Sequence, residues 1–238
     1  MDIEKNSTTI KDLFQLGYNT KTSLSFEEIK HSFKGIKTTH SIVFFEGLSA
    51  KYALLSFEKT NNLNLWKDYN LYFNLNFAKQ NYIGLGWAMG ELGINPTDYM
   101  HDIAHEWKSK VWNGNGYFTG TIKRRSVLRT MSFSKNIPLE SLPDFIQGFG
   151  RSLWYSYKGN LEKISSLIIA FKKEEQIHLW RGLGIAIAFV DGLSKGEWLE
   201  IKNNPYIGQL KNGFVLAYPS LKDKETQQIL EDVFEIKT

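Results

Sequence analysis

The chain has 238 residues, of which 42% are hydrophobic and 14% aromatic, which is enough to bury a core and excludes a disordered chain. Its 29 basic and 25 acidic residues leave a net charge of only +4, which disfavours a nucleic-acid-binding protein. The absence of cysteine excludes disulfides, thiolate metal sites and cysteine nucleophiles. No targeting segment and no apolar run of roughly twenty residues stands out, so we expect a cytoplasmic protein without a membrane span.

The N-terminal part of the chain predicts short helices followed by a longer one. An amphipathic piece covers Ile10–Leu16. Ser25 and Glu28 form a capping-box pair, in which each side chain satisfies a backbone N–H of the other residue, so a helix is expected over Phe26–Phe33. The apolar positions of His40–Phe57 recur at helical spacing, so this segment is also predicted to be helical.

The middle of the chain begins with an asparagine-rich stretch. Residues 59–70 are predicted to form a loop, with a short strand around Leu63 and Leu65 as the alternative. A helix is expected over Leu71–Leu92. Asn95–Asp98 then combines a capping asparagine, a proline and an acidic side chain, which predicts the start of the next helix. One face of that helix would carry Met100, Ile103, Ala104 and Trp107.

Start signals of the same kind recur in the C-terminal part. Ser141–Asp144 predicts the start of a helix that contains Gly148–Tyr157. Asn160 is expected to cap the helix after it, because its side chain can accept a hydrogen bond from a free backbone N–H of the first turn. Ser220 is expected to cap a terminal helix that ends at Phe234.

One segment, Gly182–Val190, has two interpretations. Small and large residues alternate along it, which is the period of a β-strand. We favour a buried helix, because Gly182 and Ala186 lie one turn apart and would let two helix backbones approach closely.

Glycine and aromatic residues recur along the chain in one register. The copies are Gly148–Trp154 with Trp180–Gly184, Gly84–Trp87 with Trp112–Gly116, and the half-copy Phe45–Ser49. Phe45 and Trp112 lie 67 positions apart, and Trp112 and Trp180 lie 68 apart. The register predicts an all-α single domain of pseudo-repeated helical units, packed through glycine- and alanine-rich helices. The units would cover about residues 13–80, 81–146 and 147–238.

A metal site was considered at His101 and His105, which lie four positions apart with Asp102 and Glu106 beside them. Ligands at that spacing share one helix face. The order is not His-Glu-x-x-His and no third ligand is evident, so a solvated polar face is the favoured interpretation. We therefore expect no metal and no cofactor.

Two charged residues, Glu46 and Arg151, stand inside the glycine-rich copies, where packing should be tightest. A buried charge is costly unless it is paired, so Arg151 is expected to bond Glu46 or several carbonyl groups. A structural ion pair is the favoured interpretation and a ligand site the alternative. Tryptophans flank these positions, with core filling as their default role and pocket lining as a second one. The candidate ligand-binding residues are Glu46, Trp87, Trp112, Arg151, Trp154 and Trp180.

Four motifs together resemble a known family. They are Phe44-Phe45-Glu46-Gly47, Tyr82-Ile83-Gly84-Leu85-Gly86-Trp87-Ala88-Met89, Gln147-Gly148-Phe149-Gly150-Arg151-Ser152-Leu153-Trp154 and Leu179-Trp180-Arg181-Gly182-Leu183-Gly184. The family is an uncharacterised bacterial "domain of unknown function" family whose members are often encoded in enediyne polyketide gene clusters. Where it favours Asp-Gly-Tyr-Gly-Phe-His, this chain has Asn113-Gly114-Asn115-Gly116-Tyr117-Phe118. The resemblance implies a place in specialised-metabolite biosynthesis, without an assigned reaction.

Two classes of function follow. The lack of a triad, metal cluster or phosphate loop favours a non-catalytic accessory that binds an apolar polyketide-type intermediate or a biosynthetic partner enzyme; a homodimer is also considered. The alternative is a cofactor-independent cyclase or isomerase that holds a polyunsaturated intermediate, helped by Glu46 or Arg151. A pocket holding either residue without a counter-charge would favour the enzyme, and an exposed apolar patch would favour the binding protein.

Overall fold

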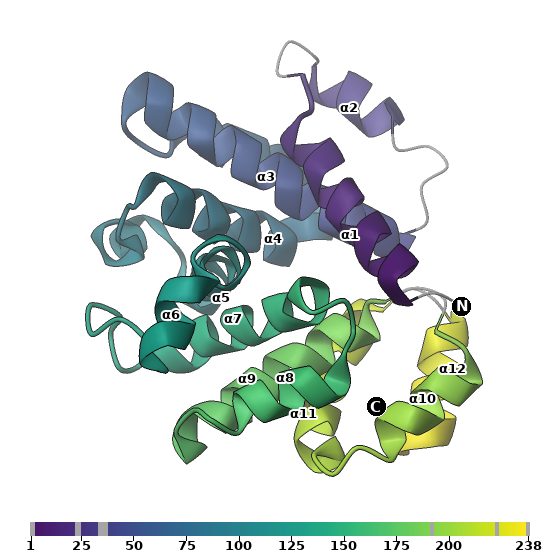
Figure 1. The fold of residues 1–238 in the computed structure, drawn as a ribbon. Helices are drawn as coiled ribbons and strands as arrows, with labels where there is room; N and C mark the ends of the chain where they lie inside the picture. Colours follow the sequence, from purple (N-terminus) through teal and green to yellow (C-terminus); the bar gives the residue numbers. More distant parts are fainter. Residues whose placement is uncertain (1–2, 22–24, 33–37, 191–192, 222–223, 237–238) are drawn as a thin grey trace.

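The computed structural model describes residues 3–21, 25–32, 38–190, 193–221 and 224–236, and within these ranges it contains helices and no strand. The all-α prediction is confirmed for this part of the chain, which forms a single domain (Figure 1). None of its helices is both long and apolar enough to cross a lipid bilayer. The elements, with η for 3₁₀ helices, are α1 (Ile3–Tyr18), α2 (Phe26–Ser32), α3 (Thr38–Thr60), α4 (Asn64–Leu92), η1 (Pro96–Asp102), α5 (His105–Ile122), α6 (Arg124–Thr130), α7 (Leu142–Ser156), α8 (Leu161–Ile168), α9 (Lys173–Ala188), α10 (Lys195–Lys202), α11 (Ile207–Ala217), η2 (Tyr218–Ser220) and α12 (Lys224–Phe234).

A row of helices forms the body of the molecule, in the order α1, α3, α4, α5, α7, α9 and α11 (Figure 1). Within this row α5 and α7 run in the same direction. The Asn113 side chain of α5 contacts Asp144 near the start of α7, whereas Gly120, later in α5, packs against Ser152, later in α7. Because parallel neighbours need a return connection, α6 and the loop after it carry the chain back between them.

Helices of the row touch at glycines near their middle. A Cβ atom added at Gly114 of α5 would lie 1.9 Å from the Ile83 carbonyl oxygen of α4, and one added at Gly116 would lie 1.9 Å from the Phe145 carbonyl oxygen of α7. No side chain fits at such distances, so the two backbones are in direct contact. The same alternation, with one glycine towards the preceding helix and the next towards the following one, occurs at Gly84 and Gly86, Gly114 and Gly116, Gly148 and Gly150, and Gly182 and Gly184.

Two large apolar clusters stabilise the row. One includes Phe45 and Trp66 of α3 and α4, and the other includes Phe149, Trp154 and Trp180 of α7 and α9. A buried phenylalanine or tryptophan removes about 200 Å² from water. The clusters therefore supply a large share of the hydrophobic free energy that offsets the chain entropy lost on folding.

Several predicted helix boundaries are confirmed by their bonds. The Ser25 backbone N–H donates to Glu28 Oε2 at 2.7 Å, and the Glu28 N–H donates to Ser25 Oγ at 3.2 Å. The Asn160 side chain accepts a backbone N–H of α8 at 2.9 Å. The helical interpretation of Gly182–Val190 is correct as far as Ala188, where α9 ends.

The prediction of a loop over residues 59–70 is correct only for residues 61–63, because α3 continues to Thr60 and α4 begins at Asn64. Leu63, Trp66 and Tyr69 are buried at every third position, which is a helical period, so the strand alternative is wrong. The asparagines led to the prediction of a loop because they lower the helix propensity of the stretch. They do not interrupt its apolar face.

A bend at Phe77 divides α4 into two halves, the second of which belongs to the row. The Phe77 backbone leaves helical values, with φ −135° and ψ 19°. Across the bend the Tyr69 hydroxyl donates to Asn81 Oδ1 at 3.1 Å, and Asn81 Nδ2 donates to Asn70 Oδ1 at 2.9 Å. These bonds hold the first half of α4 against the second.

The start signal at Asn95 is confirmed, but it opens a different element from the one predicted. Its side chain accepts the Thr97 N–H at 3.2 Å, and the helix that follows is the short η1. At Ile103 the backbone is extended, with φ −116° and ψ 126°, so α5 begins separately at His105. The four apolar residues expected on one face are therefore divided between η1, the extended link and α5.

Ser220 ends η2, and α12 is described from Lys224 to Phe234, where the predicted terminal helix also ends. The residues that Ser220 would have to cap lie outside the described ones. Helices α10 and α11 are not among the predicted elements, although Ser194 and Glu197 form the same kind of capping box as Ser25 and Glu28. Phe33, the predicted end of the second helix, lies outside the described residues.

We expect Gly148→Ala to destabilise the protein. The added Cβ would lie 1.8 Å from the Asn113 carbonyl oxygen, so α5 and α7 must move apart. The free energy of unfolding should fall by about 3 kcal/mol or more. Urea denaturation followed by far-UV circular dichroism measures the loss.

The matched control is Gly208→Ala in α11, where an added Cβ meets nothing within 4 Å. There alanine should raise the free energy of unfolding by up to about 1 kcal/mol, because it reduces the entropy of the unfolded chain. Equal effects of the two substitutions would contradict direct backbone contact.

Candidate functional site

A cavity of about 320 Å³ lies along one side of the row of helices. Its lining comes from α3, α4, α5, α7, α9 and α11. In five of these helices, the residue directly before the glycine that contacts the preceding helix lines the cavity. These residues are Glu46, Ile83, Asn113, Gln147 and Arg181. Since the glycine faces the neighbouring helix, the residue about 100° around the helix faces the open side of the row. Tyr117, Arg151 and Ile185, four positions later, continue the same rows.

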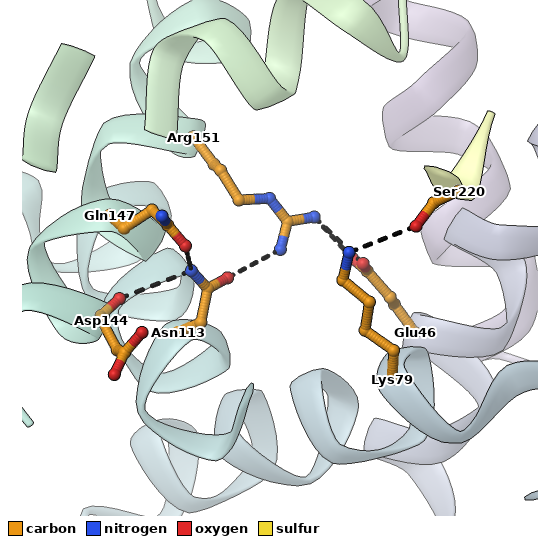
Figure 2. A network of polar contacts seen from close by, with 7 residues as sticks. All are labelled: Glu46, Lys79, Asn113, Asp144, Gln147, Arg151 and Ser220. Atoms are coloured by element: carbon orange, nitrogen blue, oxygen red, sulfur yellow. Dashed lines mark hydrogen bonds and ion pairs between the residues drawn. The ribbon is translucent and has the colours of Figure 1, made fainter. Parts of the chain in front are cut away.

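The Arg151 guanidinium crosses this cavity from α7 to α3 (Figure 2). Its Nη2 donates to both carboxylate oxygens of Glu46, at 3.0 and 3.1 Å, and its Nη1 donates to Asn113 Oδ1 at 2.9 Å. The guanidinium also lies over the Tyr117 ring, 4.8 Å from its centre, where the face of the ring attracts a cation. The Arg151 and Glu46 side chains are only 12% and 4% exposed, so the predicted buried pair is confirmed.

Asn113 is the polar residue that orients this pair. Its side-chain nitrogen donates to Gln147 Oε1 at 2.9 Å and to the Asp144 backbone oxygen at 3.4 Å (Figure 2). With both amide hydrogens directed at α7, the Asn113 oxygen is left to accept from Arg151. Three helices, α3, α5 and α7, are thereby joined through one network.

Positive charge exceeds negative charge around the cavity. Lys79, Lys110 and Arg181 line it besides the Arg151–Glu46 pair, and Asp144 is the carboxylate that accompanies them. Within the described part of the chain, the Arg181 Nε is buried and has no hydrogen-bond partner. A buried donor without an acceptor costs free energy, so an external acceptor at this place would be stabilising.

Burial shifts the pKa of two of these groups. The pKa of Lys79 falls to about 8, first because burial disfavours its charge and then because Lys110 and Arg151 repel it, against the opposing attraction of Glu46. Burial raises the pKa of the Asp144 carboxyl, although the neighbouring cations Lys110 and Arg181 oppose the rise. Both shifts reduce the charge that the cavity must hold.

Two tyrosines stand between this cavity and a second one of about 490 Å³. Tyr117 and Tyr155 line both, with ring centres 6.5 Å apart. Burial raises the pKa of both phenols above the ordinary value, so they are neutral at physiological pH. The second cavity is bordered by Phe14 and Trp87 on its apolar side.

Residues 4–229 match the family model described as a protein of unknown function, DUF1702. The chain belongs to the DUF1702 family. No curated protein and no solved structure matches it. The description of the DUF1702 family names no reaction and no ligand.

Of the six candidate residues, the structure brings Glu46 and Arg151 together at the central cavity, while the four tryptophans lie outside its lining. Trp87 packs against Phe14 and borders the second cavity, and Trp112 borders a separate cavity of about 520 Å³ beside α6. Trp154 and Trp180 are buried in the apolar cluster of α7 and α9.

The charged residues of the DUF1702 cavity that sequence reasoning missed are Lys79, Lys110, Asp144 and Arg181. Arg181 carries a usable signal, because it precedes a contact glycine just as Glu46 does. Lys79 lies four positions before Ile83 on the same helical row. These relations become visible only when the glycines are known to mark helix contacts.

The histidines considered as metal ligands lie elsewhere in the DUF1702 chain. His101 is exposed at the end of η1, 3.2 Å from Asp102, and Lys67 donates to the same carboxylate at 2.6 Å. His105 begins α5 instead of continuing the helix of His101. Among the residues that the structure describes, no group of three histidines or carboxylates is placed to hold a metal.

We expect Arg151→Met to lower the free energy of unfolding by about 3–5 kcal/mol, because the Glu46 carboxylate would stay buried without its partner. Urea denaturation measures the loss. Lys67→Met is the control, since the Lys67–Asp102 pair is 44% and 31% exposed and should contribute less than about 1 kcal/mol. Wild-type stability of Arg151→Met would show that the pair is not structural.

Proposed function

We propose that this DUF1702 protein binds an amphipathic anion, a small molecule with an apolar, unsaturated body and a carboxylate or similar group. The observation that carries the proposal is the central cavity, where unpaired cations and apolar walls meet. The protein would serve as a non-catalytic accessory in polyketide-type biosynthesis, since a released polyketide chain combines these two features.

The anionic end of the ligand is assigned from the balance of charge. Arg151 and Glu46 neutralise each other, which leaves Lys79, Lys110 and Arg181 against Asp144. An anion near Arg181 would accept from its unpartnered Nε and from the guanidinium edge, a geometry that suits a carboxylate. The Arg181 Nε is buried without an acceptor, so an anion that accepts from it would relieve that cost.

The apolar body of the ligand is assigned from the remaining wall. It consists of Ile42, Val43, Ile83, Ile185, Ala186, Phe189 and Leu216. A volume of about 320 Å³ is at the lower end of the range for small-molecule sites, and such sites are apolar with few convergent polar groups. The apolar intermediate expected from the sequence thus fits this wall.

A binding role is favoured over the cyclase or isomerase alternative by the state of Glu46 and Arg151. Both carboxylate oxygens of Glu46 accept from Arg151, so each residue has a counter-charge and neither is placed to exchange a proton with a ligand. The enzyme alternative requires one of them without a counter-charge in the cavity.

We also infer that the chain is built from repeats of one unit, a glycine-bearing helix with its return segment. Gly47, Gly84, Gly114, Gly148, Gly182 and Gly213 lie 30 to 37 positions apart and occupy contact positions in successive helices. The register of 67 to 68 residues would then span two such units.

A fluorescent polyene acid tests the binding proposal. cis-Parinaric acid should bind and gain fluorescence on leaving water, while its uncharged methyl ester should bind at least tenfold more weakly. Arg181→Met should weaken acid binding by about tenfold or more and leave the ester unaffected, because a charge-assisted hydrogen bond contributes about 1.5–3 kcal/mol.

Lys195→Met is the matched control for that titration. It removes one positive charge at an exposed position of α10, away from the cavity lining, and should leave both affinities unchanged. Equal affinities for the acid and the ester, or equal losses in Arg181→Met and Lys195→Met, would contradict an anion site in the cavity.

A further inference from the structure

Lys79 is placed unlike an ordinary surface lysine. It lies two residues after the bend of α4 and lines the central cavity, where the charged side chains that act on it are Glu46 from α3, Lys110 from α5 and Arg151 from α7. Its ammonium donates to Ser220 Oγ at 3.3 Å, a long bond to a neutral acceptor (Figure 2). The Glu46 carboxylate is not the hydrogen-bond partner of Lys79, because both Glu46 oxygens accept from Arg151.

This placement favours the neutral amine. A lysine ammonium in a partly apolar site, beside two other cations and without a carboxylate of its own, loses its proton more readily than one in water. With a pKa of about 8, Lys79 is unprotonated in roughly a tenth or more of molecules at neutral pH, whereas a lysine in water is almost entirely charged. An uncharged amine carries the lone pair that a nucleophile needs.

We propose that Lys79 forms an imine with an aldehyde or ketone carbonyl of a molecule held in the cavity. The Nζ lone pair adds to the carbonyl carbon, and one amine proton passes to the carbonyl oxygen by way of water to give a carbinolamine. The second amine proton then also passes to that oxygen, which leaves as water as the C=N bond forms. One carbonyl and one amine thus give one imine and one water, and no oxidant or reductant takes part.

The cavity supplies the two other things that such a step needs. Its apolar wall at Ile83 and Ile185 excludes bulk water, which would hydrolyse the imine. Lys110 and Arg181 would hold an anionic group of the same molecule and fix the carbonyl against Lys79. In this last respect the inference rests on the proposed function.

Reductive trapping tests the proposal. 4-Formylbenzoate with sodium cyanoborohydride at pH 7.5 should modify Lys79 at least tenfold faster than Lys195, an exposed lysine in the same molecule, as measured by peptide mapping of the wild-type protein. Benzaldehyde, which lacks the carboxylate, should modify Lys79 more slowly than 4-formylbenzoate does. Lys79→Arg should abolish the fast modification at position 79 and leave the slower modification of the other lysines unchanged.

The pH profile gives a second readout. The ratio of Lys79 to Lys195 modification should be high at pH 7 and fall towards one above pH 10, because the pKa of Lys79 is about 8 and a lysine in water has a pKa of about 10.4. Modification of Lys79 no faster than Lys195, or preferential modification of Lys110, would overturn the proposal.

Its failure is distinguishable from failure of the proposed function. If 4-formylbenzoate displaces cis-parinaric acid but does not trap Lys79, the anion site stands and the imine is refuted. If both aldehydes trap Lys79 at equal rates, the reactive lysine stands and the anion site is refuted.

Discussion

Direct contact between helix backbones is the constraint on which the rest of the structure depends. At Gly84 an added Cβ would lie 2.3 Å from the Glu46 carbonyl oxygen, closer than any side chain allows. Helices so closely packed bring residues of non-adjacent helices within reach of one another. Arg151 of α7 thus bonds Glu46 of α3, although α4 and α5 lie between them in the row. The cavity and its charges follow from that spacing.

The buried Arg151–Glu46 pair neutralises two of the charges that line the cavity. Replacing a buried ion pair by apolar residues is often neutral or stabilising, so the pair need not be present for stability alone. Arg151 is satisfied by Glu46 and Asn113 and covered by the Tyr117 ring, which leaves it few donors for a ligand. These contacts fix the position of the Arg151 guanidinium in the cavity, whereas the buried Nε of Arg181 has no hydrogen-bond partner among the described residues.

Local signals predicted much of the fold. Capping residues such as Ser25 and Asn160 act within one turn of helix, so their effect can be read from neighbouring residues. The helix over Gly182–Ala188 was predictable because small residues one turn apart need a partner helix. The start of α4 at Asn64 was not, because burial of Trp66 and Tyr69, a tertiary effect, outweighs the low helix propensity of the asparagines.

The site was predictable only in part. Glu46 and Arg151 were found because a charge in a tightly packed stretch requires a partner. Lys79 and Arg181 were missed because they meet only when helices far apart in the chain curve around one cavity. For Trp154 and Trp180 the default interpretation as core filling holds, whereas Trp87 and Trp112 border other cavities than the one that contains Arg151.

A double-mutant cycle between Gly84→Ala and Arg151→Met tests this account most directly. If helix spacing holds the pair together, Gly84→Ala already separates Glu46 from Arg151. The loss of unfolding free energy in the double variant should then be smaller, by at least about 1 kcal/mol, than the sum of the losses in the two single variants. Gly184→Ala, which meets Leu210 of α11 instead, should be additive with Arg151→Met. Additivity within about 0.5 kcal/mol for Gly84→Ala as well would contradict the account.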